Sequence, residues 1–203
     1  FLGETYQALG QPGRAEGEYR QAAELDPLES LPLLALGRMQ AAQGRMQAAQ
    51  GREVEALASY QAAVGATPGW GPAQVALGNA LRAQGDLEGA ADHYQKALLA
   101  DGDVPEGLAY DFSAQLASAQ VEAPGADYVR NDYFAIDGDE RRVLFMHPES
   151  SAAYRVEMPE GGQLAFAVAL SPDSWSQPGD GATFAVYVET EAGTNQVFST
   201  YID

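Results

Sequence analysis

The sequence contains few side chains of the types that nucleophilic or metal-assisted chemistry needs. Its histidines are His93 and His147, and it has no cysteine. Without cysteine, thiolate nucleophiles, thiolate metal ligands and disulfide bonds are excluded. Two histidines in different halves of the chain do not form the closely spaced ligand set that zinc requires. We therefore expect His93 to be a surface or packing residue, and His147, which precedes Pro148, to be a turn residue.

Carboxylates are plentiful, but no pair is set apart as a catalytic or metal-binding group. The sequence has 29 Asp and Glu residues against 11 Lys and Arg. Asp137, Asp139 and Glu140 could offer oxygen ligands to calcium, although their spacing departs from the EF-hand loop. No zinc-protease, phosphate-binding or nucleophile-elbow motif occurs. We predict no catalytic residue, no metal site and no cofactor, and we keep a hydrolase built on Asp and Glu as an alternative.

The net charge of −18 is unevenly distributed. Residues 1–102 carry 7 basic and 12 acidic residues, and residues 103–203 carry 4 and 17. Such an acidic surface repels phosphate backbones, so nucleic acid is excluded as a partner. No apolar run reaches the roughly 18 residues that a membrane span needs, so we expect no membrane insertion within this segment. The chain begins at Phe1 rather than Met, and we expect it to be cut from a longer protein.

A pattern of small and aromatic residues occurs three times in the first half. Leu-Gly pairs begin at Leu2, Leu36 and Leu77, with separations of 34 and 41 residues. Downstream of the three pairs come an Ala, a Tyr four residues later and a second Ala three residues after that: Ala15, Tyr19 and Ala22; Ala56, Tyr60 and Ala63; Ala90, Tyr94 and Ala97. A helix breaker follows each set, at Pro27, Pro68 and Gly102. Repetition at this period predicts stacked structural repeats.

This pattern resembles the tetratricopeptide repeat family. The first copy matches it best and also has the family's Tyr three residues after the Gly, at Tyr6, where the later copies have Gln40 and Leu81. The resemblance implies pairs of antiparallel helices, with small residues where helices approach closely and tyrosines between them. We therefore expect Ala15, Ala56 and Ala90 to be buried.

The resemblance also implies that partner peptides bind the concave surface formed by the first helix of each repeat. Carried onto this sequence, that surface includes Leu34, Arg38, Val75, Asn79 and Arg82. Of these, Arg38, Asn79 and Arg82 are hydrogen-bond donors that could hold a peptide backbone or carboxylate. The lysine-rich carboxylate clamp of the family is not reproduced. A solvated surface without a partner is the alternative.

The second repeat is longer because of a tandem duplication. Residues 38–44 and 45–51 both read RMQAAQG. Seven residues are about two helical turns, so the helix phase changes by only about 20°. We predict that the first helix of this repeat continues through Gly44, with a looped-out insertion as the alternative. After the third repeat, Leu108, Phe112 and Leu116 recur at helical spacing and predict a helix that covers the last hairpin.

In the second half, the apolar period changes from helical to strand-like. Alternating apolar residues occur at 152–158, 164–170 and 184–188, separated by clusters of Gly, Pro, Asp and Asn. This pattern is typical of an antiparallel β-sandwich, here with five or six strands and incomplete at its C-terminus. We therefore predict an α + β protein of two domains: an all-α tetratricopeptide solenoid at 1–119 (repeats 1–27, 28–68 and 69–102, covering helix 103–119), a linker at 120–127 and a β-sandwich at 128–203.

The β-rich half also resembles carbohydrate-binding-like sandwich modules of large bacterial membrane proteins. The resemblance rests on residues 136–139, residues 144–148 and the loop from Trp175 to Gly181. It implies an extracytoplasmic location in a bacterial envelope protein and a glycan ligand stacked on Trp175. Trp175 could instead cover one end of the sandwich.

Two functions remain open. The leading hypothesis is a non-catalytic protein-interaction scaffold that binds a partner protein or peptide segment on the concave surface. The alternative is a carbohydrate-binding accessory module of a larger cell-envelope protein.

Overall fold

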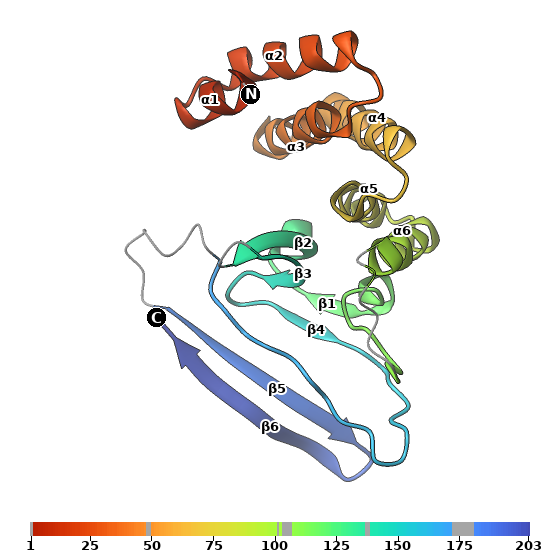
Figure 1. Ribbon diagram of the computed structural model, residues 1–203. Coiled ribbons are helices and arrows are strands. Elements are labelled where there is room, and N and C mark those ends of the chain that lie inside the picture. Colours follow the sequence, from red (N-terminus) through yellow and green to blue (C-terminus); the bar gives the residue numbers. More distant parts are fainter. Residues whose placement is uncertain (1, 48–49, 101, 103–106, 137–138, 172–180) are drawn as a thin grey trace. The chain divides into compact units, whose positions relative to one another are not determined.

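The computed structural model describes residues 2–47, 50–100, 102, 107–136, 139–171 and 181–203 (Figure 1). The chain divides into two compact units. The first consists of Phe1–Asp132 with Val143–Arg155, and the second of Tyr133–Arg142 with Val156–Asp203. The repeated sequence pattern therefore lies entirely within the first unit.

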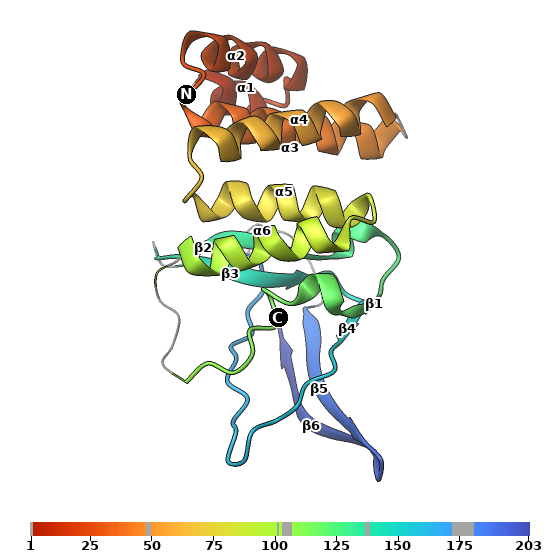
Figure 2. The same ribbon diagram turned by 90° about the vertical axis from the view of Figure 1, so that its right-hand side faces the viewer.

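Among the described residues, six α-helices form three hairpins that pack one on the next (Figures 1 and 2). The helices are α1 (Leu2–Ala8), α2 (Pro12–Leu25), α3 (Ser30–Gln47), α4 (Gln50–Ala66), α5 (Gly71–Ala83) and α6 (Leu87–Ala100). Helices α2 and α4 end just before an X-Pro pair, where the residue preceding proline disfavours helical geometry. The prediction of consecutive helical hairpins is confirmed.

A tyrosine packed against a glycine joins the two helices of every hairpin. The pairs are Gly3 with Tyr19, Gly37 with Tyr60, and Gly78 with Tyr94. In each pair, a Cβ atom on the glycine would lie 2.6 Å from the Cε1 atom of the ring, which is closer than non-bonded carbons approach. The neighbouring alanines Ala15, Ala56 and Ala90 are buried, as predicted. The ring thus occupies the space that a side chain on the first helix would otherwise fill.

A chain of polar contacts connects the junction before α5 to α6. The buried side chain of Gln74 donates through Nε2 to the carbonyl oxygen of Pro68, at 2.5 Å. Its Oε1 lies 2.6 Å from Nδ1 of His93, and since Oε1 can only accept, Nδ1 carries the hydrogen. Burial, with Lys96 adding to it, lowers the pKa of His93 below its ordinary value of 6.5. His93 is therefore a packing residue, one of the two roles expected for it.

The duplicated heptad lengthens both helices of the second hairpin. Helix α3 has 18 residues and continues through Gly44, as predicted, whereas α5 has 13. Helix α4 has 17 residues, whereas α6 has 14. Residues 48–49, between the two helices, lie outside the described part. Within the described residues, the insertion therefore adds helix to both α3 and α4.

The helix predicted at 103–119 is wrong over its described part. Residues 103–106 lie outside the description, and residues 107–115 form turns followed by a 3₁₀ helix, η1 (Leu116–Ser118). Gly107 has a φ of +80°, which ends a right-handed helix. The carboxylate of Asp111 accepts hydrogen bonds from Ser113 Oγ and the Ala114 N–H, a local pattern that competes with helix. Leu116 is nevertheless buried against Ala90 and Tyr94 of α6.

The strands form three separate two-stranded sheets in the described residues. Antiparallel pairs join β1 (Gln120–Glu122) to β4 (Ser151–Ala153) and β5 (Ala182–Thr190) to β6 (Gly193–Ile202), and β2 (Val129–Ile136) pairs with β3 (Asp139–Met146). A short 3₁₀ helix, η2 (Ala126–Tyr128), precedes β2. The segment 120–127, predicted as a linker, therefore contains a strand and a 3₁₀ turn.

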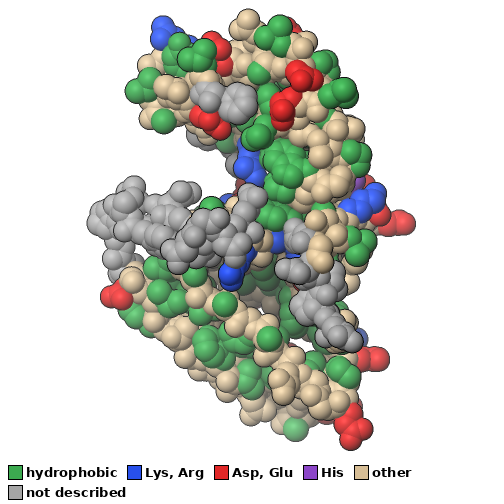
Figure 3. Space-filling view, in the orientation of Figure 1, with side chains coloured by type: hydrophobic (Ala, Val, Ile, Leu, Met, Phe, Trp, Pro, Cys, Tyr) green, Lys and Arg blue, Asp and Glu red, His purple; other side chains and the backbone are tan. Residues whose placement is uncertain are grey.

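The predicted β-sandwich is not formed by the described residues. The alternating segment 164–170 belongs to no strand, and Leu164 and Phe166 are 42% and 47% exposed. Alternation marks one apolar face, but a strand is defined by the ladder of hydrogen bonds to its neighbour, which apolar spacing does not specify. The hairpin of β5 and β6 likewise carries apolar side chains on its surface (Figure 3). The exposed ones are Tyr187, Val188, Val197 and Tyr201.

Replacing the glycine of one hairpin should destabilise the array. In Gly78→Ala, the added methyl meets the ring of Tyr94, which is buried and cannot move aside. We expect the free energy of unfolding to fall by about 1–3 kcal/mol, despite the ~1 kcal/mol that alanine gains in helix propensity. Gly17→Ala in α2 is the matched control, because nothing lies within 4 Å of its added Cβ, and it should raise stability. Urea denaturation followed by circular dichroism measures both, and equal shifts would contradict the close contact.

The lowered pKa of His93 predicts a pH dependence of stability. The unfolded chain binds a proton on His93 more readily than the folded chain does. The contribution of His93 to the free energy of unfolding is therefore fully present above pH 6.5 and is lost as the pH drops through that value. We expect the free energy of unfolding of the wild type to decline more steeply between about pH 7.5 and 5.5 than that of His93→Gln. Denaturation curves at four or five pH values suffice. Parallel pH profiles of the two proteins would disprove the contribution of His93.

Candidate functional site

The candidate site lies on the first helices of the repeats. Helices α1, α3 and α5 lie along one side of the stack, and α2, α4 and α6 along the other (Figure 1). In each hairpin, one residue directly follows the glycine that contacts the tyrosine. These residues are Glu4, Arg38 and Asn79, and they therefore occupy equivalent places. Arg82 lies one helical turn beyond Asn79. We call these four residues the first-helix face.

Asn79 binds the backbone of a distant segment through its side-chain amide. Its Nδ2 donates to the carbonyl oxygen of Asn131 at 2.7 Å, and its Oδ1 accepts from the N–H of the same residue at 3.3 Å. The same Oδ1 accepts from the hydroxyl of Tyr94 at 2.8 Å. Burial raises the pKa of Tyr94 to about 12, so the hydroxyl stays protonated and remains a donor. Tyr94 therefore fixes the orientation in which Asn79 can bind both backbone groups.

Arg82 binds two further backbone carbonyls of the same segment. Its Nη2 donates to the oxygen of Ala126 at 3.0 Å and to the oxygen of Val129. Hydrogen bonds from a charged guanidinium are stronger than those between neutral groups. Arg82 and Asn79 together thus hold residues 126–131 by main-chain atoms, without regard to most of their side chains.

Arg38 is the most open cation of the first-helix face. Its side chain is 53% exposed, and its Nη2 lies 3.9 Å from Oδ1 of Asp132. Asp132 is bound more closely by Arg130, at 2.9 Å. An ion pair of that length at an exposed position contributes little, so the guanidinium of Arg38 keeps most of its capacity to bind another acceptor.

The segment Ala126–Asp132 is also anchored by its own side chains. Val129 is fully buried among Ala90, Tyr94 and Leu116. Asn131 is fully buried too, and its Nδ2 donates to the carbonyl oxygen of Ser113 at 2.7 Å. The segment therefore combines backbone contacts to α5 with an apolar side chain inserted beside α6.

The structure places the sequence-predicted residues in three different situations. Asn79 and Arg82 act as backbone donors, the chemistry predicted for them, but toward the chain itself. Leu34 and Val75 are each 3% exposed, so neither side chain offers surface to a partner. Leu34 packs in the core between the second and third hairpins, which explains its burial. Trp175 lies outside the described residues, and so do Asp137 and residues 176–180 of the loop that carried part of the carbohydrate-binding resemblance.

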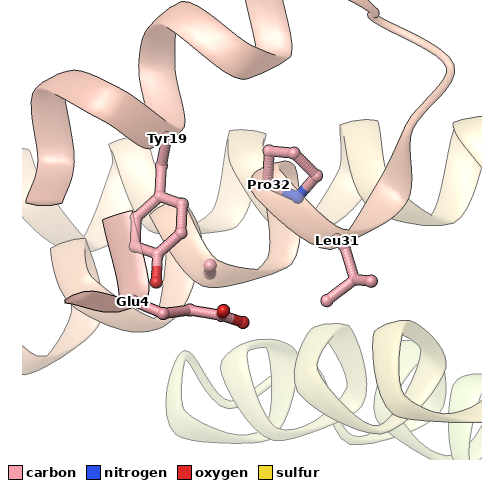
Figure 4. A pocket seen from close by; sticks show the side chains of 5 residues that line it. Glu4, Tyr19, Leu31 and Pro32 are labelled. Carbon is pink, nitrogen blue, oxygen red and sulfur yellow. The ribbon is translucent and has the colours of Figure 1, made fainter. Parts of the chain in front are cut away.

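A small pocket opens next to the first-helix face, between α1, α2 and the start of α3 (Figure 4). It is lined by Glu4, Tyr19, Leu31, Pro32 and Ala35. Leu31 is substantially exposed, and burial, followed by the charge of Glu4, raises the pKa of Tyr19. The pocket therefore presents an apolar wall and a protonated hydroxyl beside a carboxylate. The sequence pattern did not single out Leu31 or Ala35.

Other candidate chemistry finds no geometric support in the described part of the chain. No three His, Asp or Glu residues there come together as a metal-binding group. His147 is exposed in a turn after β3, where its ring lies 4.7 Å from that of Tyr128. None of the described helices is both long and apolar enough to span a membrane.

Comparison with known sequences identifies the repeats. Two tetratricopeptide repeat models match, one over residues 2–69 and the other over residues 72–103. An uncharacterized protein of Archaeoglobus fulgidus is 40% identical over 75 residues, which cover 34% of this chain and 19% of that protein. The chain therefore spans less than a fifth of this relative. The resemblance of residues 121–203 to carbohydrate-binding modules is not shown by these matches.

Solved structures are similar to about half of this chain. The crystal structure of MamA is 21% identical with a TM-score of 0.43, covering 50% of this chain and 55% of MamA. The Sgt2 TPR domain from Aspergillus fumigatus is 23% identical with a TM-score of 0.43, over 52% of this chain and 66% of that domain. PcrH, crystallised with the chaperone binding region of PopD, is 20% identical with a TM-score of 0.43, over 51% and 73%.

The identification of the repeats rests on the sequence models. They match residues 2–69 and 72–103, which form the three hairpins with their glycine–tyrosine contacts. This chain therefore contains tetratricopeptide repeats.

Proposed function

We propose that this chain is a non-catalytic protein-interaction scaffold whose first-helix face binds an extended segment of a partner protein. One observation carries the proposal. Asn79 and Arg82 hold the Ala126–Asn131 stretch, a 3₁₀ turn followed by the start of strand β2, through its backbone N–H and carbonyl groups. Main-chain contacts of this kind provide affinity for an extended peptide of almost any sequence, and adjacent pockets provide selectivity. The donor at the equivalent position of α3, Arg38, supports the same use of that helix.

The part of the surface available to a partner is narrower than the sequence predicts. Leu34 and Val75 are buried, and Asn79 and Arg82 are already bonded. Arg38 remains, together with Leu31 and Ala35 of the same helix, and these residues define the partner's chemistry. A carboxylate would pair with the guanidinium of Arg38, and an apolar side chain would contact Leu31 and Ala35.

The overall charge limits which segments can bind. With a net charge of −18, the protein repels strongly acidic ligands over distances comparable to the Debye length. The favoured partner is therefore a short extended segment with one carboxylate opposite Arg38 and an otherwise neutral or basic sequence.

Peptide selection tests this proposal. A displayed library of random peptides is screened against the full chain, and the affinities of selected peptides are measured by fluorescence polarisation at about 0.15 M salt. We expect Arg38→Ala to weaken binding roughly tenfold or more, because a charge-assisted hydrogen bond contributes about 1.5–3 kcal/mol.

Arg20→Ala is the matched control for the arginine substitution. Arg20 is similarly exposed, at 56%, but belongs to α2 on the other side of the stack. It should leave the affinity unchanged. The proposal fails when no peptide is enriched above background, or when both substitutions weaken binding equally.

A further inference from the structure

The Ala126–Asp132 segment follows the first-helix face in a defined direction. Its residues 126 and 129 contact Arg82, residue 131 contacts Asn79, and residue 132 approaches Arg38. The segment therefore runs from α5 toward α3, opposite to the order of the repeats. Two of its contacts, those at Asn79 and Arg38, fall on equivalent positions of successive repeats, and they use donors that a bound peptide would need.

The contacts at Asn131 resemble those of an added β-strand. Asn79 satisfies both the N–H and the carbonyl of this residue, as a neighbouring strand would. Val129 fills an apolar site, and Arg82 donates to the carbonyl oxygen of Val129 itself and to that of Ala126. Backbone bonds along the segment and one inserted apolar side chain are the two components of extended-peptide recognition.

We propose that Ala126–Asp132 is a resident ligand of the first-helix face: it occupies the third repeat in cis and confines a partner to the first two repeats. The occupancy itself follows from contacts within this chain, whereas the confinement of a partner rests on the proposed function. The third repeat is thus a completed complex, and the open surface begins at Arg38.

Hydrogen exchange of the full chain tests the occupancy without any partner. In Arg82→Met the apolar stem is kept and the two carbonyl bonds are lost. We expect amide hydrogens of residues 126–132 to exchange at least roughly tenfold faster, while those of α3 to α6 keep their wild-type rates. Asn79→Asp is a second variant, since it keeps the acceptor for Tyr94 and removes the donor to Asn131.

Lys96→Met is the control, because Lys96 is exposed on α6 and pairs only within its own helix, with Asp92. Its exchange pattern should match the wild type. Unchanged exchange of residues 126–132 in Arg82→Met and Asn79→Asp would overturn the proposal. So would a loss of protection in α5 and α6 together with the segment, because the segment would then be an inseparable part of the core.

A labelled synthetic peptide with the sequence of residues 124–134 provides a second measurement. Asn131→Pro removes the N–H and the side-chain amide that hold the resident segment and leaves Asn79 and Arg82 in place. We expect the peptide to bind this variant at least roughly tenfold more tightly than the wild type. If the variant folds and binds the peptide with the same affinity as the wild type, the resident-ligand proposal is wrong. If the variant does not fold, the hydrogen-exchange measurement tests the proposal instead.

The two proposals fail in different ways. An unsuccessful peptide screen would contradict the proposed binding of a partner, but it would not affect the expected faster exchange in Arg82→Met. Unchanged exchange would contradict the resident-ligand proposal, but it would not affect the binding of a peptide that depends on Arg38.

Discussion

The contact between a tyrosine ring and a glycine in each hairpin is the constraint on which the first unit depends. Because the glycine has no side chain, the ring of Tyr19, Tyr60 or Tyr94 can lie directly on the first helix. That contact sets the distance between the two helices, and the buried alanines let the hairpins stack. In the third hairpin the same ring also orients Asn79 through its hydroxyl. In that hairpin, Tyr94 therefore packs the two helices together and also orients a residue of the first-helix face.

The repeated part of the fold could be predicted because its determinants are local and recur. Ala15, Tyr19 and their equivalents lie within one hairpin, so the spacing in the sequence is also the spacing across the contact. Gly44 was placed correctly in a helix because seven added residues almost preserve the helical phase. Leu34 and Val75 were assigned to the partner surface by resemblance alone, and both are buried, Leu34 in the core between the second and third hairpins.

The rest could not be predicted because it depends on contacts between residues far apart in the sequence. Asn79 and Asn131 are 52 positions apart, and no local pattern marks residues 126–132 as a segment that binds α5. The covering helix expected from the apolar spacing does not form in the described residues. The backbone of Gly107 and the side chain of Asp111 favour turns there, and the apolar spacing alone does not reveal this. Alternation at 164–170 predicted a strand, but apolar spacing does not specify a hydrogen-bonded partner, and the segment is not a strand in the structure.

The division of the duplicated heptad between α3 and α4 has a consequence for how such arrays diversify. Residues added at the tip of a hairpin are shared by two antiparallel helices, so the base of the hairpin, where the glycine and the tyrosine meet, is left undisturbed. Hairpin length and stacking geometry are therefore separate properties. A repeat of this kind can acquire a longer arm by copying its own helical sequence, while its neighbours continue to pack as before.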